Sequence, residues 1–375
     1  MIKFNKPYIT GKEASYISNT MASGKISGNG RYTKFCQDFF EDKYKIKKAL
    51  LTTSCTAALE MAAILINIKE GDEVIIPSYT FLSTANAFVL RGAKIVFADS
   101  CSDNPNIDAA KIEGLITSKT KAIVPVHYAG FACDMDVIMD IAKRHNLFVI
   151  EDAAQAIGSY YKGKALGSIG HLATFSFHET KNVTSGEGGL LAINDVHFFE
   201  RAEIIWENGS NKAAYYRGEV DVYTWKDVGS SFLMSEINAA FLWAQLECLE
   251  KIQKRRRFIW AKYNEQLRSI NKDVFLVVPS IQKGVENNAH MYYLVCTNKK
   301  QRNGLINFLK KNGVMAAFHY QSLHQSNFYQ SKHDGRELPN TKKYSDCLVR
   351  LPFYYELKDD EIDCIIELIK SYFNK

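Results

Sequence analysis

The feature that most constrains the fold of this chain is the alternation, from residue 49 to residue 193, of short apolar runs with segments of helical periodicity. This alternation is typical of an α/β fold in which helices cover a mostly parallel β-sheet. The apolar runs are almost continuous, which indicates strands that are buried on both faces. We therefore predict a seven-stranded sheet with strands at residues 50–53, 74–77, 95–99, 122–127, 148–152, 173–177 and 190–193.

The second half of the chain has a different pattern. A long helical stretch is predicted from residue 235 to about residue 269. Because 375 residues exceed the ~250 to 300 at which one core usually stops growing, we expect a large domain and a smaller C-terminal α+β domain. We place these domains at residues 1–246 and 247–375. The other predicted elements are helices 56–66 and 135–145, strand 291–297, and helices 302–311 and 359–373.

Composition and charge argue for an enzyme-like chain. The net charge of +6 is spread among acidic residues, so it forms no nucleic-acid footprint. The densest basic run, residues 254–257, is predicted to be the solvated face of a helix, or alternatively a docking site for an anionic substrate. The eight cysteines lack disulfide or zinc spacing and are expected to be reduced thiols. No run approaches the ~18 apolar residues of a membrane span, and a signal-peptide stretch is absent from the N-terminus. We expect a cytoplasmic protein with no nucleic-acid or membrane partner.

The junction at residues 52–58 is a candidate anion site. It follows an apolar strand and opens a predicted helix, whose free N–H groups and dipole favour negative charge. The hydroxyl groups of Ser54 and Thr56, which flank Cys55, can add hydrogen bonds. The alternative is an ordinary helix cap made of Ser and Thr, with no ligand.

Asp152 is the second candidate. It ends the apolar strand 148–152, and open α/β sheets bind ligands at the carboxyl ends of their strands. A carboxylate at that edge can pair with a protonated ring nitrogen. The alternative is a structural aspartate that caps the following helix.

Lys181 is the third candidate. It lies just past the strand 173–177 and beside the glycine-rich turn 185–189. A lysine that is partly removed from water there loses its proton more easily and becomes nucleophilic. Most lysines only solvate a surface, but this one follows an anion site and a ring-nitrogen partner. That order is the one a pyridoxal 5′-phosphate (PLP) site requires.

These segments, together with the Pro-Ser-Tyr-Thr-Phe run, resemble one enzyme family over nearly the whole chain. They are similar to the DegT/DnrJ/EryC1/StrS family of PLP-dependent sugar aminotransferases. The resemblance implies the aspartate aminotransferase-like fold, known as fold type I, and a homodimer. It also implies transfer of an amino group from L-glutamate to a nucleotide-linked keto sugar. The segments that carry it are residues 77–81, 83–87, 151–155, 175–181 and 186–189.

The same resemblance implies a role for each motif residue. Lys181 would hold PLP as a Schiff base and move the proton, and Asp152 would bond the pyridinium nitrogen. Gln155 would contact the ring hydroxyl oxygen, and Phe81 would stack on the ring, although ordinary core packing beside Phe88 is the alternative for Phe81. The residues expected at the phosphate are Cys55, Thr56 and Ser176, and those expected near the substrate are His178, His319 and Tyr320. The alternative for each histidine is a purely structural role.

One segment departs from the family pattern. Many members have an asparagine that reaches the phosphate of the neighbouring subunit's cofactor, and Ser231 takes that position here. Its shorter side chain can still form a hydrogen bond. A second segment, residues 23–30, contains three glycines and is expected to be a mobile loop over the site or, alternatively, a plain turn.

Within the family, residues 51–61 and 240–247 resemble enzymes that aminate dTDP-4-keto-6-deoxyglucose for enterobacterial common antigen and related O-antigen glycans. Amination at C3 and a UDP sugar remain open from the residues alone. A rival within the family is a dehydratase, which uses pyridoxamine phosphate and lacks the Schiff-base lysine, so Lys181 argues against it. A non-catalytic regulatory protein on the same scaffold is the rival from another class.

Overall fold

A seven-stranded sheet forms the centre of the molecule. The computed structural model describes residues 1–268 and 275–373. Its strand order is β1-β9-β8-β5-β4-β2-β3. β9 runs antiparallel to both of its neighbours and the other adjacent pairs are parallel, so the predicted mostly parallel α/β sheet is confirmed. The strands are β1 (Lys48–Thr52), β2 (Glu73–Pro77), β3 (Lys94–Ala98), β4 (Thr120–Ile123), β5 (Phe148–Asp152), β8 (Leu172–Ser176) and β9 (Gly189–Ile193).

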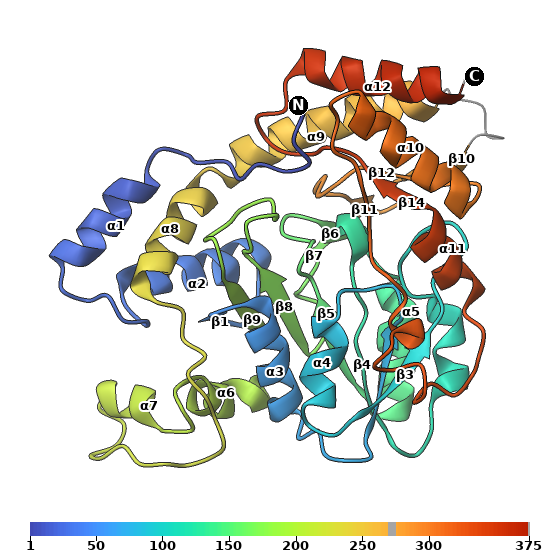
Figure 1. Ribbon diagram of the computed structural model, residues 1–375. Coiled ribbons are helices and arrows are strands. Elements are labelled where there is room, and N and C mark those ends of the chain that lie inside the picture. The colour runs from blue at the N-terminus through green and yellow to red at the C-terminus, as the bar shows by residue number, and fades with distance from the viewer. Residues whose placement is uncertain (269–274, 374–375) are drawn as a thin grey trace.

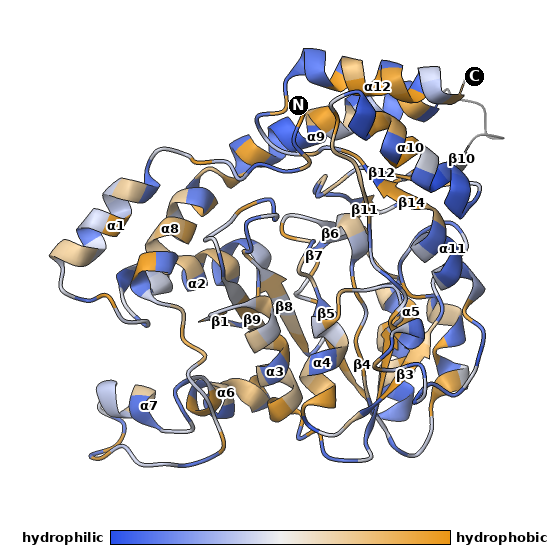
Figure 2. Ribbon diagram, in the orientation of Figure 1, coloured by the Kyte–Doolittle hydropathy of each residue, from blue (hydrophilic) through white to orange (hydrophobic). Residues whose placement is uncertain are grey.

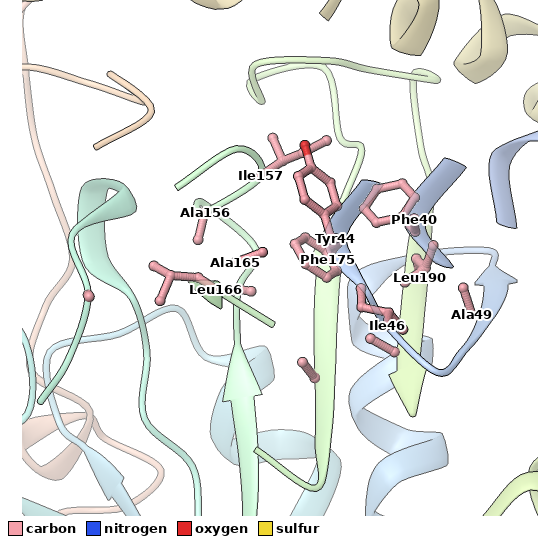
Figure 3. Packing of buried hydrophobic residues seen from close by; sticks show 14 of the residues in the cluster. Phe40, Tyr44, Ile46, Ala49, Ala156, Ile157, Ala165, Leu166, Phe175 and Leu190 are labelled. Atoms are coloured by element: carbon pink, nitrogen blue, oxygen red, sulfur yellow. The ribbon is translucent and has the colours of Figure 1, made fainter. Parts of the chain in front are cut away.

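Both faces of this sheet are buried, as the apolar runs predicted. Along β2, Val74 and Ile76 belong to one hydrophobic cluster and Ile75 to another, because successive side chains of a strand point to opposite faces. Figure 3 shows part of one cluster, in which Phe40 and Tyr44 lie against Phe175 and Leu190. The covering helices are α2 (Arg31–Tyr44), α3 (Cys55–Leu65), α4 (Ser83–Val89), α5 (Met135–His145) and α6 (Phe199–Trp206).

A second, four-stranded antiparallel sheet is built from the C-terminal part of the chain. Its order is β10-β12-β14-β13. Figure 1 shows this sheet beneath α9, α10 and α12. Hydrophilic and hydrophobic residues alternate along α12 in Figure 2, and its isoleucines are buried at helical spacing. The elements are α9 (Leu249–Arg268), β10 (Phe275–Val277), β12 (Tyr293–Cys296), α10 (Lys299–Lys311), β13 (Ala317–Phe318), α11 (Pro339–Cys347), β14 (Leu348–Arg350) and α12 (Asp359–Phe373).

The predicted single helix from residue 235 is wrong in one respect. The chain forms α8 (Glu236–Glu247) and then α9, with non-helical backbone at Cys248. α8 packs against α1 (Glu13–Ala22) and α2, whereas α9 packs against α12, so the two helices serve different parts of the molecule. The predicted end at Ser269 lies outside the described residues. The domain boundary after residue 246 lies within the last turn of α8, close to this break, and stays a prediction.

The remaining elements are short. A small sheet of order β11-β6-β7 contains β6 (Tyr160–Tyr161), β7 (Lys164–Ala165) and β11 (Val285–Glu286), and α7 (Lys212–Tyr216) lies at the edge of the molecule in Figure 1. Among the described helices, none combines the length and the apolarity needed to cross a bilayer.

The basic run 254–257 fits neither expectation fully. Arg256 is buried, where it donates to the carbonyl oxygens of Ala289 and His290 at 3.1 and 2.6 Å. Burial lowers the pKa of Arg256 to about 9. The side chain therefore ties α9 to the loop before β12 rather than facing solvent or a substrate.

Candidate active site

A cavity of about 1220 Å³ opens at the carboxyl ends of the central strands. Its walls combine the start of α3, the ends of β5 and β8, the turn after β8, and residues 318–323 from the C-terminal part. The structure thus brings together eleven of the residues singled out from the sequence. They are Ser54, Cys55, Thr56, Phe81, Asp152, Gln155, Ser176, His178, Lys181, His319 and Tyr320.

The start of α3 forms the anion cradle. Ser54 has extended backbone and caps the helix, since its Oγ accepts from the N–H of Ala57 at 3.1 Å. Gly189 of β9 passes so close that an added Cβ would lie 2.4 Å from the backbone nitrogen of Cys55. Burial, and then the charge of Asp152, raises the pKa of the Cys55 thiol to about 12. The cradle therefore presents a neutral thiol and helix N–H groups, which suit a phosphate.

Asp152 is held at the end of β5 by neutral groups. Its Oδ2 accepts from Thr84 Oγ1 at 2.7 Å and its Oδ1 from the N–H of Ala154 at 3.2 Å. Thr80 Oγ1 lies 2.9 Å from Thr84 Oγ1 and extends this network. Within the described ranges this buried carboxylate forms no ion pair. A buried carboxylate without a cation is a partner for a protonated ring nitrogen.

Lys181 lies in the turn that follows β8, and its backbone N–H donates to the carbonyl of His178 at 2.9 Å. Its ammonium group has no hydrogen bond or ion pair to residues 1–268 or 275–373. Burial lowers the pKa of Lys181, although the nearby Cys55 and Asp152 oppose the shift. Desolvation therefore favours the neutral, nucleophilic amine that covalent binding of a carbonyl compound requires.

His319 and Tyr320 form the wall opposite the strands. Their rings stack with centroids 3.6 Å apart. Tyr320 has φ of 49°, and its hydroxyl accepts from Gln155 Nε2 at 3.1 Å. Nδ1 of His319 lies 2.8 Å from the hydroxyl oxygen of Tyr128. Gln155 thus joins the end of the large sheet to the segment that follows β13.

Phe81 and His178 lie at the more open part of the cavity. Phe81 is 52% exposed, with its ring centroid 6.2 Å from that of Tyr320, so the alternative of core packing beside Phe88 is wrong. His178 Nδ1 lies 3.0 Å from Thr180 Oγ1, and 42% of its side chain is exposed. Both rings are available to a ligand that enters the cavity.

Two parts of the chain that were expected at an active site lie outside this cavity. Ser231 is exposed and pairs with Glu207 in an isolated antiparallel bridge, so it does not line its own chain's site. Its contact with a partner's cofactor stays a prediction. Residues 23–30 do not line the cavity either, because Glu236 holds this segment as a turn by accepting from the N–H of Gly30 at 2.9 Å. The expectation of a loop over the chain's own site is wrong.

Comparison with models of known protein families shows which family this chain belongs to. The model of the DegT/DnrJ/EryC1/StrS aminotransferase family matches residues 7–370. This chain belongs to that family. It is therefore a PLP-dependent sugar aminotransferase of fold type I, an enzyme that uses a sugar substrate and an amino donor.

The similar proteins come from distant organisms. The chain is 35% identical to MJ1066 of Methanocaldococcus jannaschii, an uncharacterized protein, over 98% of this chain and 96% of the other. It is 34% identical to the spore coat polysaccharide biosynthesis protein SpsC of Bacillus subtilis, over 99% and 96% of the two chains. Among solved structures it is similar to Spr1654 of Streptococcus pneumoniae in its PMP form, which is assigned as a sugar aminotransferase. That likeness has a TM-score of 0.92 and 28% identity over 100% and 99% of the chains.

The cavity of this aminotransferase fits the family's cofactor. The neutral cradle at α3 suits the phosphate, the uncompensated Asp152 suits the ring nitrogen, and the desolvated Lys181 suits the aldehyde carbon. Bound PLP supplies an electron sink that stabilises negative charge on the substrate carbon. Phe81 and Ser176, which line the cavity, would help to hold the cofactor there.

The structure also adds site residues that sequence reasoning missed. His290 lines the cavity, and its Nδ1 lies 2.8 Å from Oδ1 of the buried Asn182. Burial, and then the charge of Lys181, holds the pKa of His290 well below its ordinary value. Arg350, at the end of β14, lines the cavity as well. Neither follows a predicted strand end, so no local motif marked them.

Proposed function

We propose that this aminotransferase moves an amino group from L-glutamate to C4 of dTDP-4-keto-6-deoxy-D-glucose. The product would be dTDP-4-amino-4,6-dideoxy-D-galactose, which would enter enterobacterial common antigen or O-antigen synthesis. The observation that carries the transaminase chemistry is the meeting of a desolvated Lys181 and an uncompensated Asp152 in one cavity. The sugar assignment is supported by the resemblance of residues 51–61 and 240–247 to enzymes with this substrate.

The residues divide the work as follows. Lys181 would hold the cofactor and, once an amine substrate had displaced it, its free amine would move a proton to or from the substrate carbon. Asp152 keeps the ring nitrogen protonated, and the α3 cradle anchors the phosphate through both half-reactions. His319 and Tyr320 form an aromatic wall that keeps water away from the reacting carbon. The cofactor held by these residues would serve as the carrier of the amino group between the donor and the keto sugar.

The size of the cavity supports a nucleotide-linked substrate. At about 1220 Å³ it exceeds the ~300 to 1,000 Å³ of usual small-molecule pockets. Leu59, Val89 and Phe97 also line it, so a ligand larger than the cofactor finds apolar walls in this cavity. A family dehydratase is disfavoured because Lys181 stands in the site, and a regulatory role leaves the desolvated amine unexplained.

We also propose that the enzyme acts as a homodimer. Residues 207–231 form a projecting segment in which Tyr216, Val222 and Trp225 are largely exposed, Trp225 at 84%. A second copy that covers these side chains would remove the exposed apolar area and bring Ser231 toward the partner's site. Sedimentation should give a dimer, and a fully active monomer at catalytic concentration would contradict it. The eight unpaired cysteines suit the reducing cytoplasm, where we place the enzyme.

The substrate proposal is tested with a panel of keto sugars. Purified protein loaded with PLP is given L-glutamate and either dTDP-4-keto-6-deoxyglucose, a dTDP-3-keto-6-deoxy sugar or a UDP-4-keto sugar. Mass spectrometry measures the amino sugar, and NMR of the product assigns the aminated carbon and its configuration. Preferred turnover of the dTDP 4-keto sugar to the axial 4-amine is expected. Preferred turnover of the 3-keto sugar or of the UDP sugar would replace this proposal.

A further inference from the structure

Arg350 is a half-buried arginine at the wall of the active-site cavity, with an unmet hydrogen bond at its buried Nε. It ends β14, where it pairs in register with Tyr293 of β12 and Ala317 of β13. Its side chain lines the cavity, and its buried Nε has no hydrogen-bond partner in the described part of the chain. A buried donor beside a fixed positive charge is unfavourable unless something supplies an acceptor. The cavity is the side from which a ligand can do so.

Arg350 is the cation that remains in the cavity once the cofactor has taken up Lys181. Among the described residues that line the cavity, the lysine and arginine side chains are those of Lys181 and Arg350. Lys181 is occupied by the cofactor in the proposed function. Burial, followed by the charge of Arg350, holds the pKa of His319 well below its ordinary value, so this ring stays neutral. An anionic group of a substrate therefore finds Arg350 as its charged partner.

We propose that Arg350 binds the α-carboxylate of the amino donor. This inference rests on the proposed aminotransferase function and deepens it. The planar guanidinium presents paired donors that match the two oxygens of a carboxylate. A donor's α-carboxylate is attached to the carbon that carries the transferred nitrogen, so it must lie near Lys181. Arg350 is close enough for its charge to act on Lys181 and on His319.

The other anions of the reaction fit this position less well. The cofactor phosphate has its own cradle at the start of α3, where the charges acting on Cys55 are those of Asp152 and Lys181. The diphosphate of a sugar nucleotide is attached at C1, across the sugar ring from a reacting C4. It therefore lies farther from Lys181 than a donor carboxylate does.

The guanidinium of Arg350 is held in place before any ligand binds. Its Cζ lies 4.8 Å from the ring centroid of Phe4, which is a cation–π distance. The N–H of Phe353 donates to the carbonyl of Phe4 at 3.1 Å, and Ile2 forms a parallel bridge with Val314. The N-terminal segment thus packs the arginine from one side and leaves the cavity side to the donor.

The test separates the donor half-reaction from the sugar half-reaction. Arg350→Met and Arg350→Lys are compared with Arg302→Met, a matched control. Arg302 is buried, also has an Nε without a partner in the described part of the chain, and lies 5.4 Å from the Phe318 ring, but it does not line the cavity. Loading with PLP is checked first from the visible absorption band. Calorimetry then measures binding of glutarate, a dicarboxylate that cannot react.

Arg350→Met should weaken glutarate binding and raise the L-glutamate concentration for half-maximal reaction about 100-fold, as expected for loss of a buried charge partner. For Arg350→Lys, the glutarate affinity and the half-maximal L-glutamate concentration should lie between those of wild type and Arg350→Met. Reaction with 4-aminobutanoate, which lacks the α-carboxylate, and reaction of the amino-sugar product in the reverse direction should stay near wild type. Arg302→Met should show no such selectivity.

Three results with amino-acid substrates would overturn the assignment of Arg350. They are an unchanged glutamate response in a loaded Arg350→Met enzyme, an equal loss with 4-aminobutanoate, and the same selective loss in Arg302→Met. An equal loss with the amino sugar would assign Arg350 to the diphosphate instead and would also overturn it. Failure of the proposed function would give a different result, because wild-type enzyme would then react with amino acids but with no keto sugar.

Discussion

The large sheet and the C-terminal sheet contribute to the active site in different ways. The large sheet supplies groups at the ends of its strands, where Asp152 ends β5 and Ser176 ends β8. The C-terminal part supplies His319, Tyr320 and Arg350 from short antiparallel strands and their connections. The first set fits the cofactor, and the second faces the space that a substrate would fill. The comparison indicates that cofactor chemistry and substrate choice reside in separate parts of the chain.

Lys181→Ala should have the largest effect on turnover, because it removes the amine that the proposed function places at the centre of the chemistry, beside the groups supplied by the large sheet. General acid–base catalysis alone contributes about 10² to 10⁴-fold, and loss of cofactor attachment should push the deficit beyond that range. The variant should still fold and bind pyridoxamine phosphate through α3 and Asp152. Steady-state turnover and equilibrium binding of pyridoxamine phosphate measure the two effects. Turnover above roughly a few per cent of the wild-type rate would contradict the proposed role of Lys181.

Asp152→Asn should reduce turnover about 100-fold, since a neutral amide does not favour the protonated ring nitrogen. Thr84 Oγ1 can still donate to the amide oxygen, so folding should be preserved. Turnover is measured beside circular dichroism. Asp195→Asn, which changes a half-buried helix cap that does not line the cavity, is the control. Near-wild-type turnover of Asp152→Asn would make the carboxylate structural only.

The attachment of PLP to the apoenzyme should depend on pH in a way that reports Lys181. Burial lowers the pKa of this amine below the ordinary 10.5. Neutral amine is the reactive form, so the attachment rate should rise with pH and level off below 10.5. Stopped-flow absorbance measures this rate. A rate that keeps rising through the range of a free lysine would show an amine that is not desolvated.

Tyr320→Phe should have the smallest effect, and it sharpens the division between the two parts. It removes the hydrogen bond from Gln155 but keeps the ring that stacks on His319. One hydrogen bond of this kind is worth about 1 kcal/mol, or roughly five-fold. We expect the change in the KM for the keto sugar, with the PLP band and the glutamate half-reaction unaffected. An equal change in cofactor binding would show that the two parts are not separate.

The sequence predicted the large sheet well because its signals are local. Strand 148–152 and helices 135–145 and 359–373 match β5, α5 and α12, since each is bounded by turn or cap residues and has clear periodicity. The motifs at Cys55, Asp152 and Lys181 lie at strand ends that this pattern already located. Their presence in one cavity followed from the parallel order of the strands.

The C-terminal part was harder to predict for a physical reason. β13 and β14 contain two and three residues, and their pairing joins segments far apart in the sequence. No periodicity can appear over so few residues, so Arg350 carried no local signal. The break at Cys248 was missed because no glycine or proline marks it. There the direction of the chain is set by packing of α8 and α9 against different partners.

The most direct test of the account is the position of the cofactor on the chain. Protein loaded with PLP is reduced with borohydride, digested, and mapped by mass spectrometry, with unreduced protein as the control. The account predicts loss of the visible band and a single modified peptide in which the cofactor is fixed to the Nζ of Lys181. Modification of another lysine, or a loaded protein from which denaturation releases all cofactor after reduction, would contradict it.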